Sequence, residues 1–154
     1  MTKTLVFDMD GTIANFYMVS NWLEDLRNEN PRPYIVAEPM YDMASLGIIL
    51  NLLKERGWRI AVTSWLAKDS TEQFKKLVRK AKREWLERYA FPFDEIHLVQ
   101  YGATKANSTR KNGGFQIIVD DNAEVRKGWH LGGTIDANKD ILSELIALYL
   151  AEVA

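Results

Sequence analysis

The chain has 154 residues, 47% hydrophobic and 27% charged, with a formal net charge of −1 and no cysteine. This length fits one domain with a sizeable core, and the balanced charge excludes attraction of the whole molecule to nucleic acid or anionic lipid. Without cysteine there are no disulfides or thiolate metal sites. No apolar run approaches the ~18 residues of a membrane span, and the first residues lack a signal-peptide pattern, so we expect a cytoplasmic protein.

The hydrophobic pattern predicts strands that alternate with helices, and local signals mark several helix ends. Asp42 and Ser70 are expected to cap helices, and Gln73 completes a capping-box pattern with Ser70. Gly57 is expected to end one helix, and the prolines after residue 30 break another. In chain order, the expected elements are strand 4–7, helix 20–29, helix 42–57, strand 58–62, helix 70–89, strand 96–99, strand 115–119, helical turns 122–128, strand 133–135 and helix 140–150.

This alternation favours a parallel sheet with helices packed on both faces. We therefore expect one α/β domain over residues 1–154, a Rossmann-like three-layer α/β/α arrangement around a central parallel sheet. In such sheets the ligand binds beyond the carboxyl ends of the strands. The residues that follow the strands are therefore the first candidates for functional side chains.

Acids, a hydroxyl and a lysine stand at four consecutive strand ends. They are Asp8, Asp10, Thr63, Lys105, Asp120 and Asp121. Four carboxylates at one edge repel one another unless a cation lies among them, and Mg²⁺ prefers such oxygen ligands together with a substrate phosphate. A lysine and a hydroxyl are suited to bind phosphate oxygens. The pattern therefore predicts a phosphoryl-transfer site.

The same residues resemble the motifs of the haloacid dehalogenase (HAD) superfamily. The run Asp8-Met9-Asp10-Gly11-Thr12 after an apolar strand is similar to the first motif, and Thr63, Lys105 and the pair Asp120-Asp121 follow in the order of the other three. The resemblance covers residues 3 to 125 and implies a HAD-like fold and a Mg²⁺-dependent phosphatase. Aspartate at both positions of the first motif favours phosphatase chemistry over the dehalogenase branch, which lacks the second acid.

The resemblance also implies a role for each acid. Asp8 would attack the phosphorus and form an aspartyl-phosphate, and Asp10 would protonate the leaving oxygen and then activate water. Mg²⁺ would be held by Asp8, the backbone carbonyl of Asp10 and Asp120, with Asp121 binding directly or through water.

The remaining motif residues are expected to bind the phosphoryl group. Thr63 is preferred to Ser64 as the hydroxyl, and the resemblance gives it this role together with Lys105. Lys105 is preferred to Lys111 because it follows a strand at a helix start, whereas Lys111 leads into a glycine-rich loop. Gly11 and Thr12 complete the first motif, where a tight turn brings backbone amides toward phosphate.

Residues 14–40 separate the first motif from the next core helix and are interpreted as a reduced cap. The first motif with its following aromatic resembles deoxyribonucleotide 5'-nucleotidases, and the whole chain resembles small stand-alone HAD proteins of phages. Phe16 therefore either stacks on a nucleobase or, with Tyr17 and Trp22, packs the cap onto the core. Trp65 is a further candidate for the mouth of the site.

The expected substrate is a small phosphomonoester such as a nucleotide. The helix over 70–89 carries seven basic residues, which raises the alternative of a polynucleotide 3'-phosphatase, but Glu72, Glu84 and Glu87 interleave and favour a solvated face. A non-catalytic domain that binds a nucleotide or a partner is the other alternative. No membrane partner is expected, and the sequence leaves the oligomeric state open.

Overall fold

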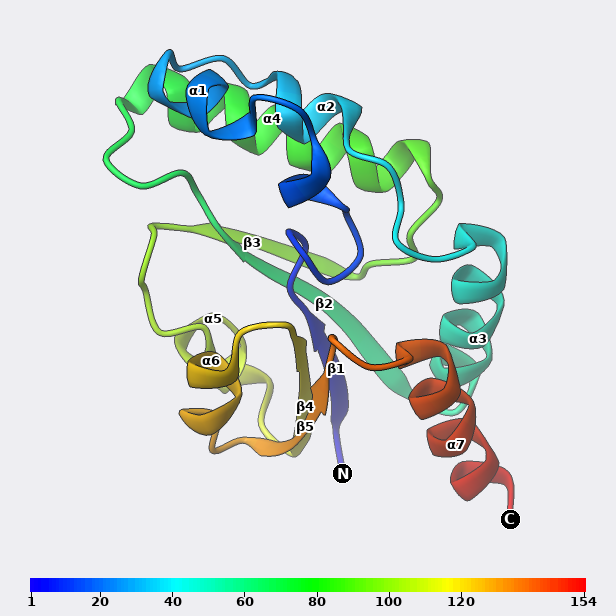
Figure 1. The fold of residues 1–154 in the computed structure, drawn as a ribbon. Helices are drawn as coiled ribbons and strands as arrows, with labels where there is room; N and C mark the ends of the chain where they lie inside the picture. The colour runs from blue at the N-terminus through cyan, green and yellow to red at the C-terminus, as the bar shows by residue number, and fades with distance from the viewer.

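A five-stranded parallel sheet forms the centre of the computed structural model, which describes residues 1–154 (Figure 1). The strand order is β3-β2-β1-β4-β5, so β1 lies in the middle, and every neighbouring pair is parallel. The predicted central parallel sheet is confirmed. The strands are β1 (Lys3–Phe7), β2 (Trp58–Trp65), β3 (Glu95–Val99), β4 (Phe115–Asp120) and β5 (Gly132–Asp136).

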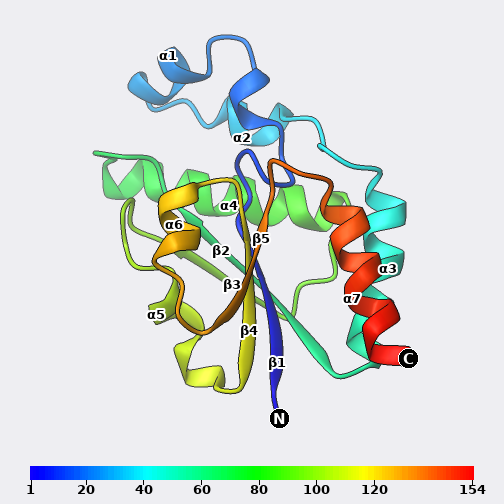
Figure 2. The same ribbon diagram turned by 60° about the horizontal axis from the view of Figure 1, so that its bottom comes forward.

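Helices cover both faces of the sheet, as Figure 2 shows. Alternate residues of a strand point to opposite faces, so Leu5 and Phe7 enter the larger core while Val6 enters a smaller core with Trp129. The larger core is covered by helices α3 (Met43–Glu55), α7 (Ile141–Val153) and the C-terminal part of α4 (Glu72–Arg88); the smaller is covered by α5 (Ala106–Thr109) and α6 (Ala123–Lys127). The result is the predicted three-layer arrangement.

The expected cap of α3 is present, whereas the cap of α4 lies one residue beyond its expected position. Asp42 caps α3 by accepting from the amide of Ala44, and Asp140 caps α7 in the same way. The cap of α4 is Thr71, whose hydroxyl accepts from Phe74 N at 3.1 Å, and not Ser70. Ser70 instead donates to a carbonyl of the preceding loop. Strand β2 also runs three residues beyond its predicted end.

The segment between β1 and α3 contains three short helices where one was expected: η1 (Phe16–Met18), α1 (Trp22–Arg27) and α2 (Arg32–Val36). The prolines do break α1, but Pro31 and Pro33 lie in the cap and first turn of α2, where a missing amide proton costs nothing. Helix α2 packs against α4 and α1 packs against α2, beyond one end of the sheet (Figure 1). None of the helices combines the length and apolar composition of a membrane span.

Candidate active site

Three carboxylates meet where β1 and β4 end. Phe7, the last residue of β1, pairs with Val119 of β4. Asp8, directly after β1, therefore lies beside Asp120, the last residue of β4, and Asp121 comes next along the chain. One oxygen from each of the three carboxylates lies within 4.8 Å of the others, and Asp8 and Asp120 are buried. The sheet register therefore brings together acids that are more than 100 residues apart in the sequence.

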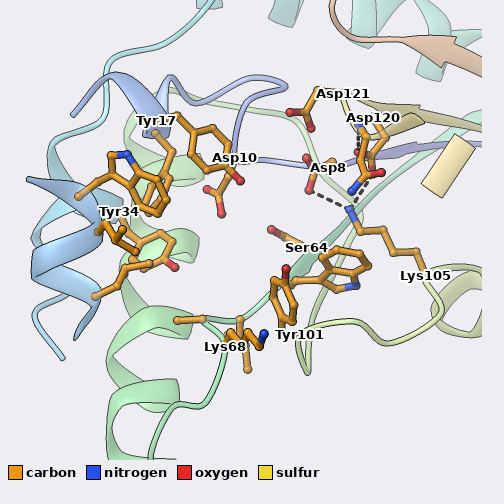
Figure 3. Close-up of a pocket in the computed structure, with 18 residues that line it drawn as sticks. Asp8, Asp10, Tyr17, Tyr34, Ser64, Lys68, Tyr101, Lys105, Asp120 and Asp121 are labelled. Carbon is orange, nitrogen blue, oxygen red and sulfur yellow. Dashed lines mark hydrogen bonds and ion pairs between the residues drawn. The ribbon is translucent and has the colours of Figure 1, made fainter. Parts of the chain in front are cut away.

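Lys105 joins two of these acids, as the dashed lines in Figure 3 show. Its Nζ donates to Asp8 Oδ1 at 2.9 Å and to Asp120 Oδ2 at 2.7 Å, and the side chain is buried. Burial disfavours the ammonium charge, but the carboxylates of Asp8 and Asp120 outweigh this and raise the pKa of Lys105. Lys111 lies exposed in η2 (Arg110–Asn112). The preference for Lys105 at the site agrees with this geometry.

The carboxylates are held under electrostatic strain that a divalent cation would relieve. Burial, and then the charge of Asp8, raise the pKa of Asp121 to about 7, and the same causes raise that of Asp120. Carboxylate oxygens at close range are the donor type that Mg²⁺ prefers. The residues present therefore fit a magnesium ion, and Asp8, Asp120 and Asp121 are the side chains that could hold it.

Two residues of the first motif shape this cluster from within. Thr12 is fully buried and donates to Asp8 Oδ2 at 3.0 Å, so in this structure it orients Asp8. Gly11 has a φ of +79°, and a Cβ there would lie 2.4 Å from Asp121 Oδ2 and 3.1 Å from Tyr17 Cε2. The turn therefore needs glycine for its backbone conformation and for the close approach of Asp121.

A cavity of about 390 Å³ opens beside the carboxylates (Figure 3). Its wall includes Asp8, Asp10, Lys105, Asp120 and Asp121. Aromatic side chains form much of the rest of the wall. These aromatic residues are Phe16, Tyr17, Trp22, Tyr34, Trp65 and Tyr101. Trp65 thus lines the site as predicted, whereas Tyr101 and the exposed Lys68 had no signal in the sequence, because both lie in loops between elements.

Phe16 packs mainly within the protein. Its ring stacks on Tyr34 with centroids 4.6 Å apart, contacts Tyr17 and Trp22 edgewise or obliquely, and is only 2% exposed. The packing role considered for Phe16 is therefore present. The aromatic surface that remains open belongs chiefly to Tyr17 and Tyr101, which are 52% and 51% exposed.

The two hydroxyls at the end of β2 are arranged differently from the expectation. Ser64 lines the cavity, whereas Thr63 does not; Thr63 is fully buried and its Oγ1 has no hydrogen-bond partner. Neighbouring residues of a strand point to opposite faces, so only one of the two can face the cavity. The geometry favours Ser64, and the preference for Thr63 is not supported.

A buried lysine, Lys82 of α4, was missed. The basic residues of this helix are expected on a solvated face, but the side chain of Lys82 is 0% exposed and its Nζ donates to Asp10 Oδ2 at 3.0 Å. It lies in the buried stripe of α4 between Val78 and Trp85. A lysine four residues after Val78 and three before Trp85 was the signal available in the sequence.

The whole chain is similar in fold to a crystal structure of D,D-heptose 1,7-bisphosphate phosphatase from Burkholderia thailandensis. The TM-score is 0.55 at 14% sequence identity, covering 96% of this chain and 98% of that chain. No family model and no curated protein matches the sequence. At this identity the likeness concerns the fold alone, and it confirms the predicted Rossmann-like α/β/α architecture.

Proposed function

We propose that this protein is a Mg²⁺-dependent phosphomonoester hydrolase. The observation that carries the proposal is the cluster of Asp8, Asp120 and Asp121 around Lys105, at the mouth of a cavity and on the fold of a phosphatase. A cation-binding set of acids beside a fixed ammonium group is suited to hold a phosphoryl group and its developing charge.

In the proposed reaction Asp8 attacks the phosphorus, the bond from phosphorus to the ester oxygen breaks, and Asp10 gives that oxygen its proton. Asp10 then takes a proton from water, which attacks the aspartyl-phosphate and releases inorganic phosphate while Asp8 is regenerated. Lys105 and Ser64 bind phosphoryl oxygens. Bound to Asp8, Asp120, Asp121 and the Asp10 carbonyl, Mg²⁺ would neutralise phosphoryl charge.

The proposed substrate is a small phosphomonoester such as a nucleotide, with residues 14–40 as a reduced cap. A cavity of about 390 Å³ suits a small molecule, and the open rings of Tyr17 and Tyr101 offer stacking surface for a planar group. Three of the basic residues of α4 that could bind a polynucleotide pair with acids of the same helix. These pairs are Lys75–Glu72, Lys80–Glu84 and Arg83–Glu87, at 3.0, 3.9 and 3.9 Å.

Phosphate release from a panel of esters tests this function. The panel contains an aryl phosphate, nucleoside monophosphates and 3'-phosphorylated oligonucleotides, each with Mg²⁺ and with EDTA. We expect Mg²⁺-dependent release, fastest with the small esters. Preference for the oligonucleotide, with steep salt sensitivity, would favour end processing instead. No release from any ester by folded protein would refute the hydrolase and favour a binding role.

Mg²⁺ is expected to raise the melting temperature more at pH 8 than at pH 5.5. The folded pKa of Asp121, about 7, exceeds its ordinary value of 3.8, so the metal-free folded state binds the extra proton and loses stability as pH rises through this interval. A cation that binds the ionised cluster reverses that loss. Asp121→Asn should stabilise the metal-free protein at pH 8 and reduce the Mg²⁺ effect.

Thermal melts of wild type, Asp121→Asn and the exposed control Glu84→Gln, with Mg²⁺ or EDTA, measure this difference. The control should follow wild type at both pH values. If Mg²⁺ raised the melting temperature of wild type and of Asp121→Asn equally, Asp121 would not be a metal ligand.

A further inference from the structure

Lys82 is a buried cation that the proposed chemistry has not yet used. All three protons of its ammonium group are engaged: Nζ donates to Asp10 Oδ2 at 3.0 Å, Ser64 Oγ at 2.7 Å and the Trp65 carbonyl at 2.8 Å. The ring of Tyr34 lies 5.1 Å from Nζ. Removing a lysine from water is costly, and an apolar residue would fill this position in the stripe of α4. The placement therefore calls for a reason beyond packing.

The geometry divides the acids of the site between two lysines. Lys105, beside α5, binds Asp8 and Asp120, whereas Lys82 reaches Asp10 from α4. Asp10 lines the cavity, yet its carboxylate is not part of the metal-binding cluster. One of its oxygens, Oδ2, is fixed by Lys82, and Oδ1 accepts no hydrogen bond from the chain. The bound oxygen anchors the carboxylate and the other is left for a ligand.

The other two bonds of Lys82 connect this anchor to the wall of the cavity. Ser64 and Trp65 end β2 and both line the cavity, so Lys82 fixes Asp10 relative to the strand that faces it. The buried rings of Phe74 and Trp85, on either side of Lys82 along the same stripe, anchor α4 in two separate hydrophobic clusters. Lys82 therefore projects from a rigid support.

We propose that Lys82 is a positioning residue that holds the Asp10 carboxyl group in place for proton transfer to the leaving oxygen. This inference rests on the proposed hydrolase function. Proton transfer requires the acid within hydrogen-bond reach of the departing oxygen, and small displacements of such groups are costly. Without Lys82, the Asp10 carboxyl group loses the hydrogen bond that fixes its place.

The test compares two aryl esters that differ in their need for a proton. The leaving group of phenyl phosphate is phenolate, a basic ion that needs a proton from an acid as it departs. The leaving group of 2,4-dinitrophenyl phosphate is a weakly basic phenolate, which departs readily without that proton. For Lys82→Met we expect kcat/KM to fall about 10-fold or more with phenyl phosphate and less than about threefold with the dinitrophenyl ester. Lys80→Met, on the same helix with a side chain 73% exposed, should match wild type with both.

The outcomes separate this inference from the function on which it rests. Equal losses of Lys82→Met with both esters, or no loss with either, would overturn the positioning role and leave the hydrolase intact. No release by wild type from either ester would overturn both. If Lys82→Met does not fold, Lys82→Gln provides the same comparison, because it removes the charge but retains a hydrogen-bond donor.

Discussion

Replacing Asp8 with asparagine is expected to lower the rate of phosphate release by at least about 10⁴-fold, as for other enzymes that lose a nucleophile. The amide has nearly the same size but cannot form the acyl-phosphate bond. Thr12 and Lys105 hold the two oxygens of Asp8; in the variant Lys105 can still donate to the amide oxygen, and the Thr12 hydroxyl can accept from the amide nitrogen. The variant should therefore fold, and its loss should appear in kcat rather than in stability.

A matched control exists at the same edge of the sheet. Asp136 ends β5 and pairs with Arg126, outside the cavity, so Asp136→Asn should keep the wild-type rate. Phosphate release gives the rates, and mass spectrometry of acid-quenched protein detects a phosphoryl group that wild type carries and Asp8→Asn lacks. A variant that retains a tenth of the activity would mean that another group attacks the phosphorus.

The strand ends were the most predictable part of the site, for a physical reason. A parallel sheet places all its carboxyl ends at one edge, so Asp8, Lys105 and Asp120 could be brought together from their sequence positions alone. The pairing of β1 with β4 makes Asp8 and Asp120 neighbours, whereas Lys105 reaches them from the start of α5, after the edge strand β3. The strand pattern could be predicted because it is a local property of the sequence.

Contacts made by single side chains across helices were much less predictable. Lys82 differs from the exposed Lys80 of the same helix in its spacing from Val78 and Trp85, a weak signal on a helix with seven basic residues. Which of Thr63 and Ser64 faces the cavity depended on where β2 ends, because an error of one residue exchanges the two faces of a strand. Tyr101 joins the cavity through the path of a loop.

Lys105 should be the second most sensitive position, and its loss should affect both rate and stability. In Lys105→Met the carboxylates of Asp8 and Asp120 lose the ammonium group that lies 2.9 and 2.7 Å from them. We expect a 10²–10³-fold fall in kcat, on the order of one lost charge-stabilising group. Breaking such a buried pair costs about 3–5 kcal/mol of folding stability, which Mg²⁺ among the same acids should partly restore.

Lys111→Met separates this role from the general effect of removing a lysine near the site in sequence. Lys111 is exposed and makes no ion pair, so its variant should match wild type in rate and melting temperature. Rates of phosphate release and thermal melts in Mg²⁺ and in EDTA measure both effects. For Lys105→Met, the fall in melting temperature should be larger in EDTA than in Mg²⁺. In EDTA the carboxylates of Asp8 and Asp120 have neither the ammonium group of Lys105 nor a metal ion beside them, whereas in Mg²⁺ the metal ion remains. Equal falls in both buffers would mean that Lys105 stabilises the fold independently of the metal site, and the phosphoryl-binding role would then rest on the rates alone.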